Sequence, residues 1–192
     1  MNREEFIALV THEKNSIAHA VAIKDNCLFL DEKLQLQSDS TKDLCSLFYQ
    51  QSGIQYPKFH KMDMLCKLGI MASEFVLMDE TKPFNDPYKV AMVFQNSSGS
   101  LQNDIQYQET LKAHASPALF VYTLPNIVMG EIAIRHGIKG ENTFFISDGI
   151  KREELATYCN VLFKDDVANA ILCAYIDFEE TNQMVEMYWI RK

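Results

Sequence analysis

The sequence lacks the features of a membrane-bound or exported protein. No stretch approaches the roughly 18 apolar residues in a row that a membrane-spanning helix needs. The amino terminus, MNREEFIALV, lacks the basic-then-apolar layout of a secretory signal, and no lipidation motif is present. With 47% hydrophobic and 23% charged residues, the composition is that of an ordinary globular protein. We therefore expect a cytoplasmic protein with no membrane partner.

Basic clusters are also scarce. The net charge is -8, and Lys and Arg are scattered except at Lys151-Arg152 and Arg191-Lys192, which leaves no footprint for phosphate backbones. Nucleic acid is therefore not an expected partner. An acidic surface also repels acidic partners such as carrier proteins, so docking of a carrier would need a local basic patch or a second subunit.

Signals for metal sites and disulfides are missing as well. No pair of cysteines has C-x-x-C spacing, and no histidines form an H-E-x-x-H pattern. We expect mostly buried, reduced thiols, no metal and no cofactor. The residues concerned are Cys27, Cys45, Cys66, Cys159 and Cys173, with His12, His19, His60, His114 and His136.

A chain of 192 residues suits one well-packed domain, so we treat residues 1–192 as a single unit. Internal repeats and low-complexity tracts are absent. The polar stretches 35–43 and 95–104 are short and lead into helix-like patterns, which indicates surface loops within a domain.

The first third of the chain gives an ambiguous pattern. Residues 5–10 and 26–32 could each be a strand, and residues 16–23 fit either a strand or a helix. A short helix is expected at 42–51, with Ser40 or Thr41 as its cap. Residues 61–78 carry apolar side chains at helical spacing and predict a helix with one buried face.

The remaining two thirds alternates between helix and strand. Asn103 and Gln106 form a capping-box pattern for a helix through His114, and Pro125 and Gly137 bracket a second helix. A further helix is expected at 149–164, and strands are expected at 89–94, 142–147, 168–178 and 184–192, the last two joined as a hairpin by a turn at 179–183. Such alternation predicts an α/β fold with a largely parallel sheet and helices on both faces.

Two segments carry a resemblance to a known family. "VFQNSSGSLQND" (93–104) and "SPALFVYTLPNIVMGEIAIRHGIKGENT" (116–143) resemble the amino-terminal half of the β-ketoacyl synthases of the thiolase-like superfamily. The second segment combines Ser-Pro, a Pro-Asn helix start, a glycine within the helix and the pair Gly137 and Gly140. The match covers residues 59–178, and it implies a three-layer α/β/α half-fold with a mixed, mostly parallel sheet.

The resemblance also implies where a nucleophile would stand. In the family, the strand after the Gly-x-x-Gly turn ends in a cysteine at the amino terminus of a helix, whose positive end lowers the thiol pKa. Aligned without gaps from Gly140, that place falls on Gly149, flanked by Ser147 and Asp148. Glycine has no side chain to attack with, and the catalytic histidines belong to a second half that the match does not cover. We therefore expect no catalytic residues.

Each residue near this turn has a structural interpretation. Asp148 is placed to cap the helix, and Ser147 has no histidine at a spacing that the family supplies. Cys159 lies in the middle of the helix among apolar neighbours, where the dipole acts weakly and burial would raise its pKa, so we expect it to be part of the core.

The first functional hypothesis is a non-catalytic subunit. It would pair with a full-length ketosynthase, or with itself, in the manner of the chain-length factors of fatty acid, polyketide or aryl polyene biosynthesis, and an acyl carrier protein is a further candidate partner. The resemblance implies that a segment near the dimer contact and the acyl tunnel sets how long a chain can grow. Its residues are Thr123, Leu124, Ile127, Val128 and Met129. The apolar runs 170–176 and 184–190 are expected to add to an exposed interface, which favours a dimer.

The second hypothesis is a small acyltransferase or thioesterase with a rearranged site at Cys159, Cys173 or Ser147. A third is a homodimeric remnant that binds an acyl chain or nothing.

Overall fold

The computed structural model describes residues 3–10, 15–82, 84–179 and 182–192. His12 and part of the turn expected at 179–183 lie outside these residues. The helices are α1 (Arg3–Val10), α2 (Thr41–Ser52), α3 (Met64–Val76), α4 (Leu101–Thr110), α5 (Pro117–Val121), α6 (Ile127–His136) and α7 (Arg152–Lys164), with short 3-10 helices η1 (Pro57–Lys61) and η2 (Pro87–Lys89). The strands are β1 (Ser16–Lys24), β2 (Cys27–Leu30), β3 (Lys33–Gln37), β4 (Val90–Asn96), β5 (Asn142–Ile146), β6 (Ala170–Glu179) and β7 (Asn182–Arg191).

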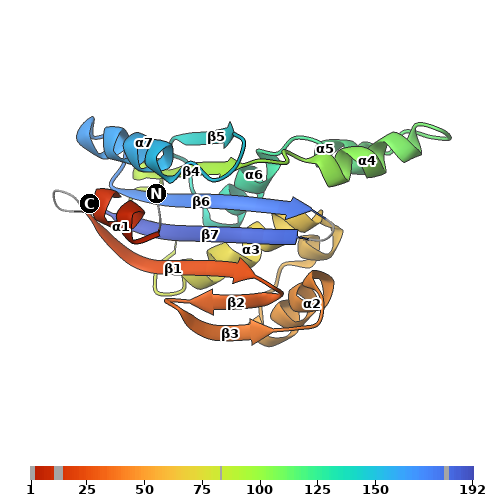
Figure 1. Ribbon diagram of the computed structural model, residues 1–192, viewed down its shortest axis with the longest axis horizontal. Coiled ribbons are helices and arrows are strands. Elements are labelled where there is room, and N and C mark those ends of the chain that lie inside the picture. The colour runs from red at the N-terminus through yellow and green to blue at the C-terminus, as the bar shows by residue number, and fades with distance from the viewer. Residues whose placement is uncertain (1–2, 11–14, 83, 180–181) are drawn as a thin grey trace.

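The strands form one seven-stranded mixed sheet in the order β3-β2-β1-β7-β6-β4-β5 (Figure 1). Strand β4 pairs in parallel with both β5 and β6. Strands β6 and β7 form the predicted antiparallel hairpin, and β1 pairs antiparallel with both β7 and β2. Strands β2 and β7 thus run opposite to the other five, which are parallel to one another in direction.

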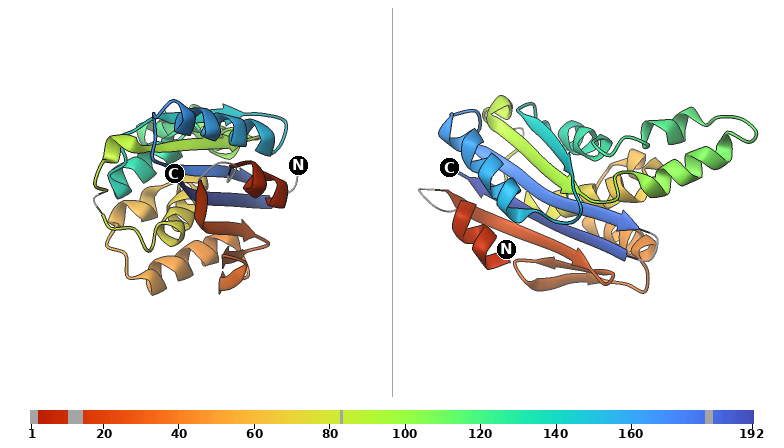
Figure 2. Two further views of the ribbon diagram at one scale, coloured as in Figure 1. Left: turned by 90° about the vertical axis from the view of Figure 1, so that its left-hand side faces the viewer. Right: turned by 45° about the horizontal axis from the view of Figure 1, so that its top comes forward.

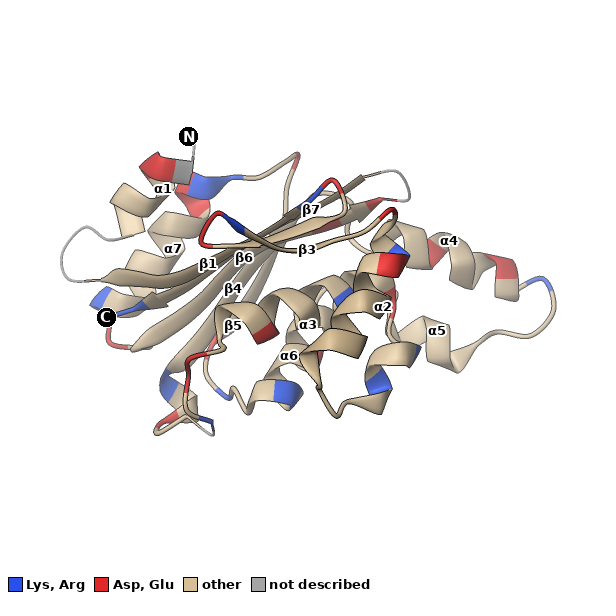
Figure 3. Cartoon of the chain, turned by 90° about the horizontal axis from the view of Figure 1, so that it is seen from below, with Lys and Arg blue, Asp and Glu red and all other residues tan. Residues whose placement is uncertain are grey.

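Helices cover both faces of this sheet. Helices α1 and α7 lie on one face, and α2, α3 and α6 lie on the other (Figures 1, 2 and 3). The larger core lies under α2, α3 and α6, and the smaller one lies under α1 and α7. All seven residues of β4 are buried, because both of its faces are covered and it has a neighbour on each side. The predicted three-layer α/β/α arrangement is confirmed.

Several local predictions were wrong for reasons of tertiary contact. Residues 5–10 belong to helix α1 and not to a strand, because Phe6 and Val10 pack into the smaller core. Asn103 does not cap a helix: α4 begins at Leu101, and the buried Asn103 side chain donates from Nδ2 to the Leu119 carbonyl at 2.9 Å. Helix α5 was not predicted. Among the described residues, no helix is long and apolar enough to cross a membrane.

The two glycines of the Gly-x-x-Gly pair have different structural roles. Gly137 ends α6 in the left-handed conformation (φ 73°), as predicted. At Gly140 the constraint is contact: a Cβ would lie 2.4 Å from the Val90 carbonyl oxygen and 2.6 Å from that of Tyr88. The main chain of this turn therefore passes directly over the start of β4, which places β5 beside β4.

The apolar carboxyl-terminal strands do not add to an exposed surface, contrary to expectation. Tyr188, Trp189 and Ile190 are at most 4% exposed and belong to the cores. Six of the exposed large apolar side chains lie instead on the arm, which we define as residues 101–124 with helices α4 and α5. The arm projects from the body of the molecule (Figures 1 and 2). These side chains are Leu101, Ile105, Leu111, Phe120, Val121 and Leu124.

Candidate functional site

The turn between β5 and α7, residues 147–151, is the place where the resemblance puts a nucleophile. Helix α7 begins at Arg152, so the predicted helix start at Gly149 was wrong. Two hydrogen bonds hold the chain away from helical geometry: Ser147 Oγ donates to the Gly149 carbonyl (2.7 Å), and the Lys151 N–H donates to Gln95 Oε1 (2.6 Å). Gly149 consequently lies outside the first helical turn.

Gly149 adopts a backbone conformation that favours glycine. Its φ is 128°, which side-chain-bearing L residues rarely adopt. A Cβ built on it would meet nothing within 4 Å, so the surroundings leave room for a side chain. The obstacle to a reactive group at this position is therefore the backbone conformation and not the available space.

Asp148 does not cap the helix, contrary to expectation. The N-cap residue is Lys151, without a side-chain capping bond, while the exposed Asp148 carboxylate pairs with Lys151 Nζ at 2.5 Å. The hydrogen bond from Lys151 lowers the pKa of Asp148, so the carboxylate stays ionised near neutral pH and is a weak base. The Ser147 hydroxyl proton is directed at the Gly149 carbonyl, which makes Ser147 a structural residue of the turn.

Polar side chains that the sequence reasoning missed support this end of the sheet. Gln95 is fully buried, and its Nε2 has no hydrogen-bond partner within the described residues. The Asn96 side chain holds the next loop by bonds to the backbone of Gly99 at 2.8 and 3.1 Å. Tyr175 donates to Asp177 at 2.9 Å, and burial raises the pKa of Tyr175 to about 12, so it remains a phenol. Gln95 and Asn96 follow an apolar run in β4. This change from apolar to polar residues at the end of a buried strand is the sequence signal that could have identified them.

Four of the five cysteines are buried in this fold, and Cys27 is half-buried. Cys159 and Cys173 are both fully buried, so the prediction that Cys159 belongs to the core is confirmed. A hydrogen bond with Cys159, together with burial, raises the pKa of Cys173 well above its usual range. Burial likewise raises the pKa of Cys45 to about 12. A protonated, inaccessible thiol does not attack an acyl thioester.

The Ser73–His136–Lys82 relay, in which Ser73 and His136 are buried, resembles a catalytic arrangement only in its residue types. His136 Nδ1 lies 2.7 Å from Lys82 Nζ, and Nε2 lies 2.9 Å from Ser73 Oγ. Burial lowers the pKa of His136 to about 3, so the ring is neutral. With Lys82 donating to Nδ1, the ring proton sits on Nε2 and is donated to Ser73, which donates onward to the Ile70 carbonyl (2.9 Å). His136 therefore cannot accept the serine proton, and the relay is structural.

The five residues assigned to a tunnel or dimer contact fall into two groups. Val128 and Met129 are buried in the larger core, where Gly69 lets α3 approach Val128 so closely that a Cβ would lie 2.3 Å from it. Ile127 is partly buried against this core. Thr123 and Leu124 lie at the base of the arm, and Leu124 is 52% exposed.

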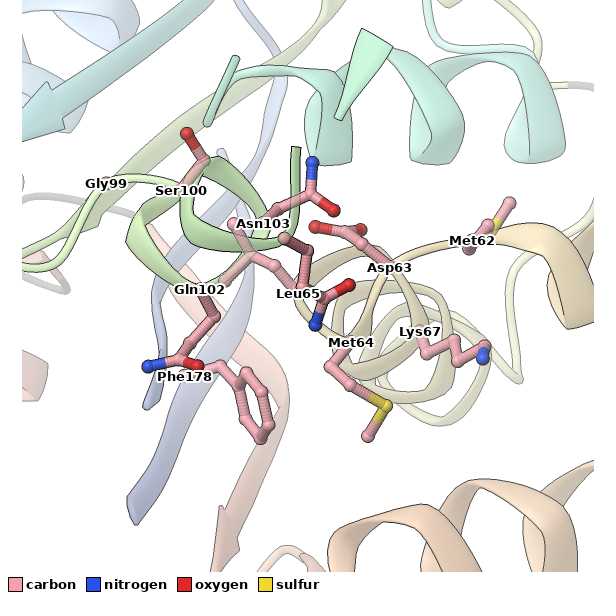
Figure 4. A pocket seen from close by; sticks show the side chains of 11 residues that line it. Met62, Asp63, Met64, Leu65, Lys67, Gly99, Ser100, Gln102, Asn103 and Phe178 are labelled. Atoms are coloured by element: carbon pink, nitrogen blue, oxygen red, sulfur yellow. The ribbon is translucent and has the colours of Figure 1, made fainter. Parts of the chain in front are cut away.

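A pocket of about 210 Å³ opens beside the base of the arm (Figure 4). It lies between the start of α3 and the start of α4, and Phe178 closes one side. Asp63 caps α3 by accepting from the Cys66 N–H at 3.0 Å, and burial raises the pKa of Asp63. The pocket is lined by Met62, Asp63, Met64, Leu65, Lys67, Gly99, Ser100, Gln102, Asn103, Gln106 and Phe178. No group of three or more metal-ligating side chains comes together in the part of the chain that the structure describes.

Comparison with known proteins gives a fold but no sequence relative. No family model matches the chain, and no curated protein matches it. Among solved structures it is similar to the ishigamide ketosynthase/chain length factor (TM-score 0.69, 14% identity, 93% of this chain and 62% of that chain). It is also similar to the ketosynthase ApeO in complex with its chain length factor ApeC from Xenorhabdus doucetiae (TM-score 0.62, 12% identity, 93% of this chain and 79% of that chain). A third similar structure is AntDE:AntF, a type II polyketide synthase acyl-carrier protein in complex with its ketosynthase bound to the hexaketide (TM-score 0.66, 12% identity, 93% of this chain and 62% of that chain).

These similarities define the class of fold. The chain has the α/β thiolase-like fold of the ketosynthase and chain length factor proteins, as the resemblance predicted. It spans about 62% of the length of the first of these chains. At identities of 12–14% the likeness extends to the fold alone, so activity and partners are matters for proposal.

Proposed function

We propose that this chain is a non-catalytic, ketosynthase-like subunit that pairs with a full-length β-ketoacyl-acyl carrier protein synthase. The observation that carries the proposal is Gly149: the residue at the expected nucleophile position has no side chain, and its φ of 128° disfavours any other residue. Ser147 and Asp148 are both engaged in bonds within the turn. Chemistry in the assembly is then the task of the partner.

Two surfaces support association with another chain. Strand β5 lies at one end of the sheet order, where an edge presents unpaired main-chain groups, and Ile146 on it is 59% exposed. The arm carries six exposed large apolar side chains on a segment that projects from the body (Figure 2). Apolar groups gathered in this way on a projecting segment mark protein interfaces. The two surfaces adjoin, since a Cβ on Gly99 before the arm would lie 3.9 Å from Ile146 Cδ1.

The contribution of the subunit would be steric. Thr123 and Leu124 at the arm base, followed by Ile127, Val128 and Met129, would limit the length of the acyl chain that the partner elongates in fatty acid, polyketide or aryl polyene biosynthesis. The proteins of similar fold are described as ketosynthase and chain length factor complexes, one of them with an acyl-carrier protein. A carrier protein would then be met by the assembly and not by this acidic chain alone.

The test is co-expression with a full-length ketosynthase from the same organism, followed by size-exclusion chromatography with light scattering. We expect a stable heteromeric complex. Phe120→Asp with Leu124→Glu places two charges on the exposed apolar surface of the arm and should weaken the complex by at least about tenfold, because each buried charge costs well over 1 kcal/mol.

The matched control is Met78→Glu, which changes an equally exposed apolar side chain (57%) at the end of α3, beside α2 and away from the arm. This variant should leave the complex intact. A chain that stays monomeric at high concentration and does not co-purify with a ketosynthase would contradict the proposal. Acylation of the chain itself by a loaded carrier protein would favour the acyltransferase alternative instead.

A further inference from the structure

His19 on β1 is bonded to a carboxylate at each ring nitrogen. Nδ1 lies 2.8 Å from Asp31 Oδ2, and Nε2 lies 2.9 Å from Asp79 Oδ2. The His19 side chain is 20% exposed, and the two carboxylates are 46% and 67% exposed. These contacts join three separate parts of the chain: β1, the turn between β2 and β3, and the loop after α3.

This geometry fixes the protonation of the ring. An ionised carboxylate is an acceptor only, so each ring nitrogen must carry a proton to form its bond. Both carboxyl groups are partly exposed to water. The ring that satisfies both bonds is the imidazolium, which carries a positive charge between two negative ones.

Asp31 is a rigid partner in this contact. It lies in the tight turn between β2 and β3, where Asp31 and Glu32 both have positive φ (47° and 68°). Its second carboxylate oxygen accepts from the Ala20 N–H at 2.8 Å. One side of the imidazolium is thereby fixed to the sheet.

Asp79 belongs to a loop that is tied to the sheet in several places. We call residues 77–82, which follow α3, the strap. Glu80 accepts from Trp189 Nε1 at 2.8 Å and pairs with Arg191 at 3.3 Å, and Lys82 bonds to His136 on α6. The strap thus connects β1 and β7 of the sheet to the helix that carries Ile127, Val128 and Met129.

We propose that the doubly protonated His19 is a pH-sensitive clamp, which holds the strap to β1 while both ring nitrogens carry a proton and releases Asp79 when the ring loses one. A neutral ring has a single N–H, so it can keep only one carboxylate bond. Asp31 is the partner that is retained, because its backbone bond to Ala20 holds it in place.

The sign of the pH effect follows from the direction of the shift. The hydrogen bond with Asp31 is the largest contribution that raises the pKa of His19 above 6.5, and the bond with Asp79 raises this pKa further. The clamp is therefore complete below about pH 6.5 and is lost as the pH rises through the raised value.

The turn, the strap and the last residues of β7 carry further charged groups. They are Glu32 on the turn, Glu80 and Lys82 on the strap, and Arg191 on β7. Glu80 and Arg191 pair with each other, and Lys82 bonds to His136. Asp31 and Asp79 are the charges in direct contact with the ring.

The direct test is nitrogen NMR of the His19 ring in the full chain across pH 5 to 9. We expect both ring nitrogens to be protonated well below pH 6.5, with a titration midpoint above 6.5 that falls in Asp79→Asn. The exposed variant Asp39→Asn, away from the clamp, should leave the midpoint unchanged. A midpoint at or below about 6.5, or one that Asp79→Asn does not move, would overturn the proposal.

A second measurement separates a clamp from a simple ion pair. The rate of backbone hydrogen exchange in the strap is compared between His19→Gln and the unaltered chain at each pH. Below the titration midpoint of His19, exchange should be about three- to tenfold faster in His19→Gln. Above the midpoint, the two rates should be equal. Exchange rates in the strap that are equal at every pH would mean that His19 does not hold it.

Discussion

Two glycines ten residues apart, Gly130 and Gly140, should respond in opposite ways to the same small substitution. Gly140 leaves no room for a methyl group, because the Val90 and Tyr88 carbonyl oxygens lie 2.4 and 2.6 Å from the place of a Cβ. Gly140→Ala should therefore lower the free energy of unfolding by about 3 kcal/mol, since backbone atoms must move. Urea denaturation measures this.

Gly130 is the matched control. It lies within α6, and a Cβ there would meet nothing within 4 Å. Gly130→Ala should raise stability by up to about 1 kcal/mol, because alanine is the better helix former. If both variants were equally destabilised, the contact at Gly140 would not be the cause.

His136 gives the protein an acid-sensitive stability. Its pKa is about 3 in the folded chain and ordinarily 6.5, so below pH 6.5 the unfolded chain binds the extra proton. Stability should then be complete above pH 6.5 and fall by up to about 1.4 kcal/mol per pH unit as the pH drops toward 3. This window is opposite to that of His19, whose contribution is lost at higher pH.

The variant His136→Gln should remove this part of the slope between pH 6.5 and 4.5, which urea titrations at several pH values would resolve. The exposed residue His114 supplies the control, and His114→Gln should leave the slope as it is. A slope that persists in His136→Gln would assign the acid sensitivity to the carboxylates instead.

At the level of elements, α1 contributes to the second helical layer. Phe6 is fully buried, with its ring centroid 4.8 Å from that of Tyr188, and Asn160 on α7 donates to the Leu9 carbonyl at 3.1 Å. Phe6→Ala should cost about 3 kcal/mol, because it leaves a cavity between α1 and the sheet. Leu9→Ala removes a side chain that is 41% exposed and should cost less than about 1 kcal/mol. Thermal or urea unfolding compares the two, and similar losses would mean that α1 is not docked through Phe6.

Elements with strong local signals could be predicted from the sequence. Gly137 marked the end of α6, and the β6–β7 hairpin followed from two apolar runs around a turn. Helix α1 could not be predicted, because its apolar residues fit a strand equally well and its burial depends on a distant helix. Asn103 satisfied a capping pattern but is used for a bond to Leu119 that no local rule anticipates.

At the scale of the whole molecule, the resemblance predicted the three layers and the location of the turn at Gly149. It did not predict that α7 starts only at Arg152, since the bond between Gln95 and the Lys151 N–H joins residues 56 positions apart. The exposed apolar surface was expected in the last strands and is found on the arm, because hydrophobicity alone does not distinguish a core strand from an interface.

If the proposed function holds, the backbone at Gly149 also constrains how a reactive residue could be introduced at this turn. A single codon change to cysteine would place sulfur on a peptide unit whose torsion angle it tolerates poorly, and the resulting thiol would stand before the helix and not on its first turn. A reactive residue would first require loosening the contacts that Ser147 and Gln95 make with this segment. Each intermediate along that route would be less stable without yet being reactive, so a single substitution at this turn is not expected to create a nucleophile.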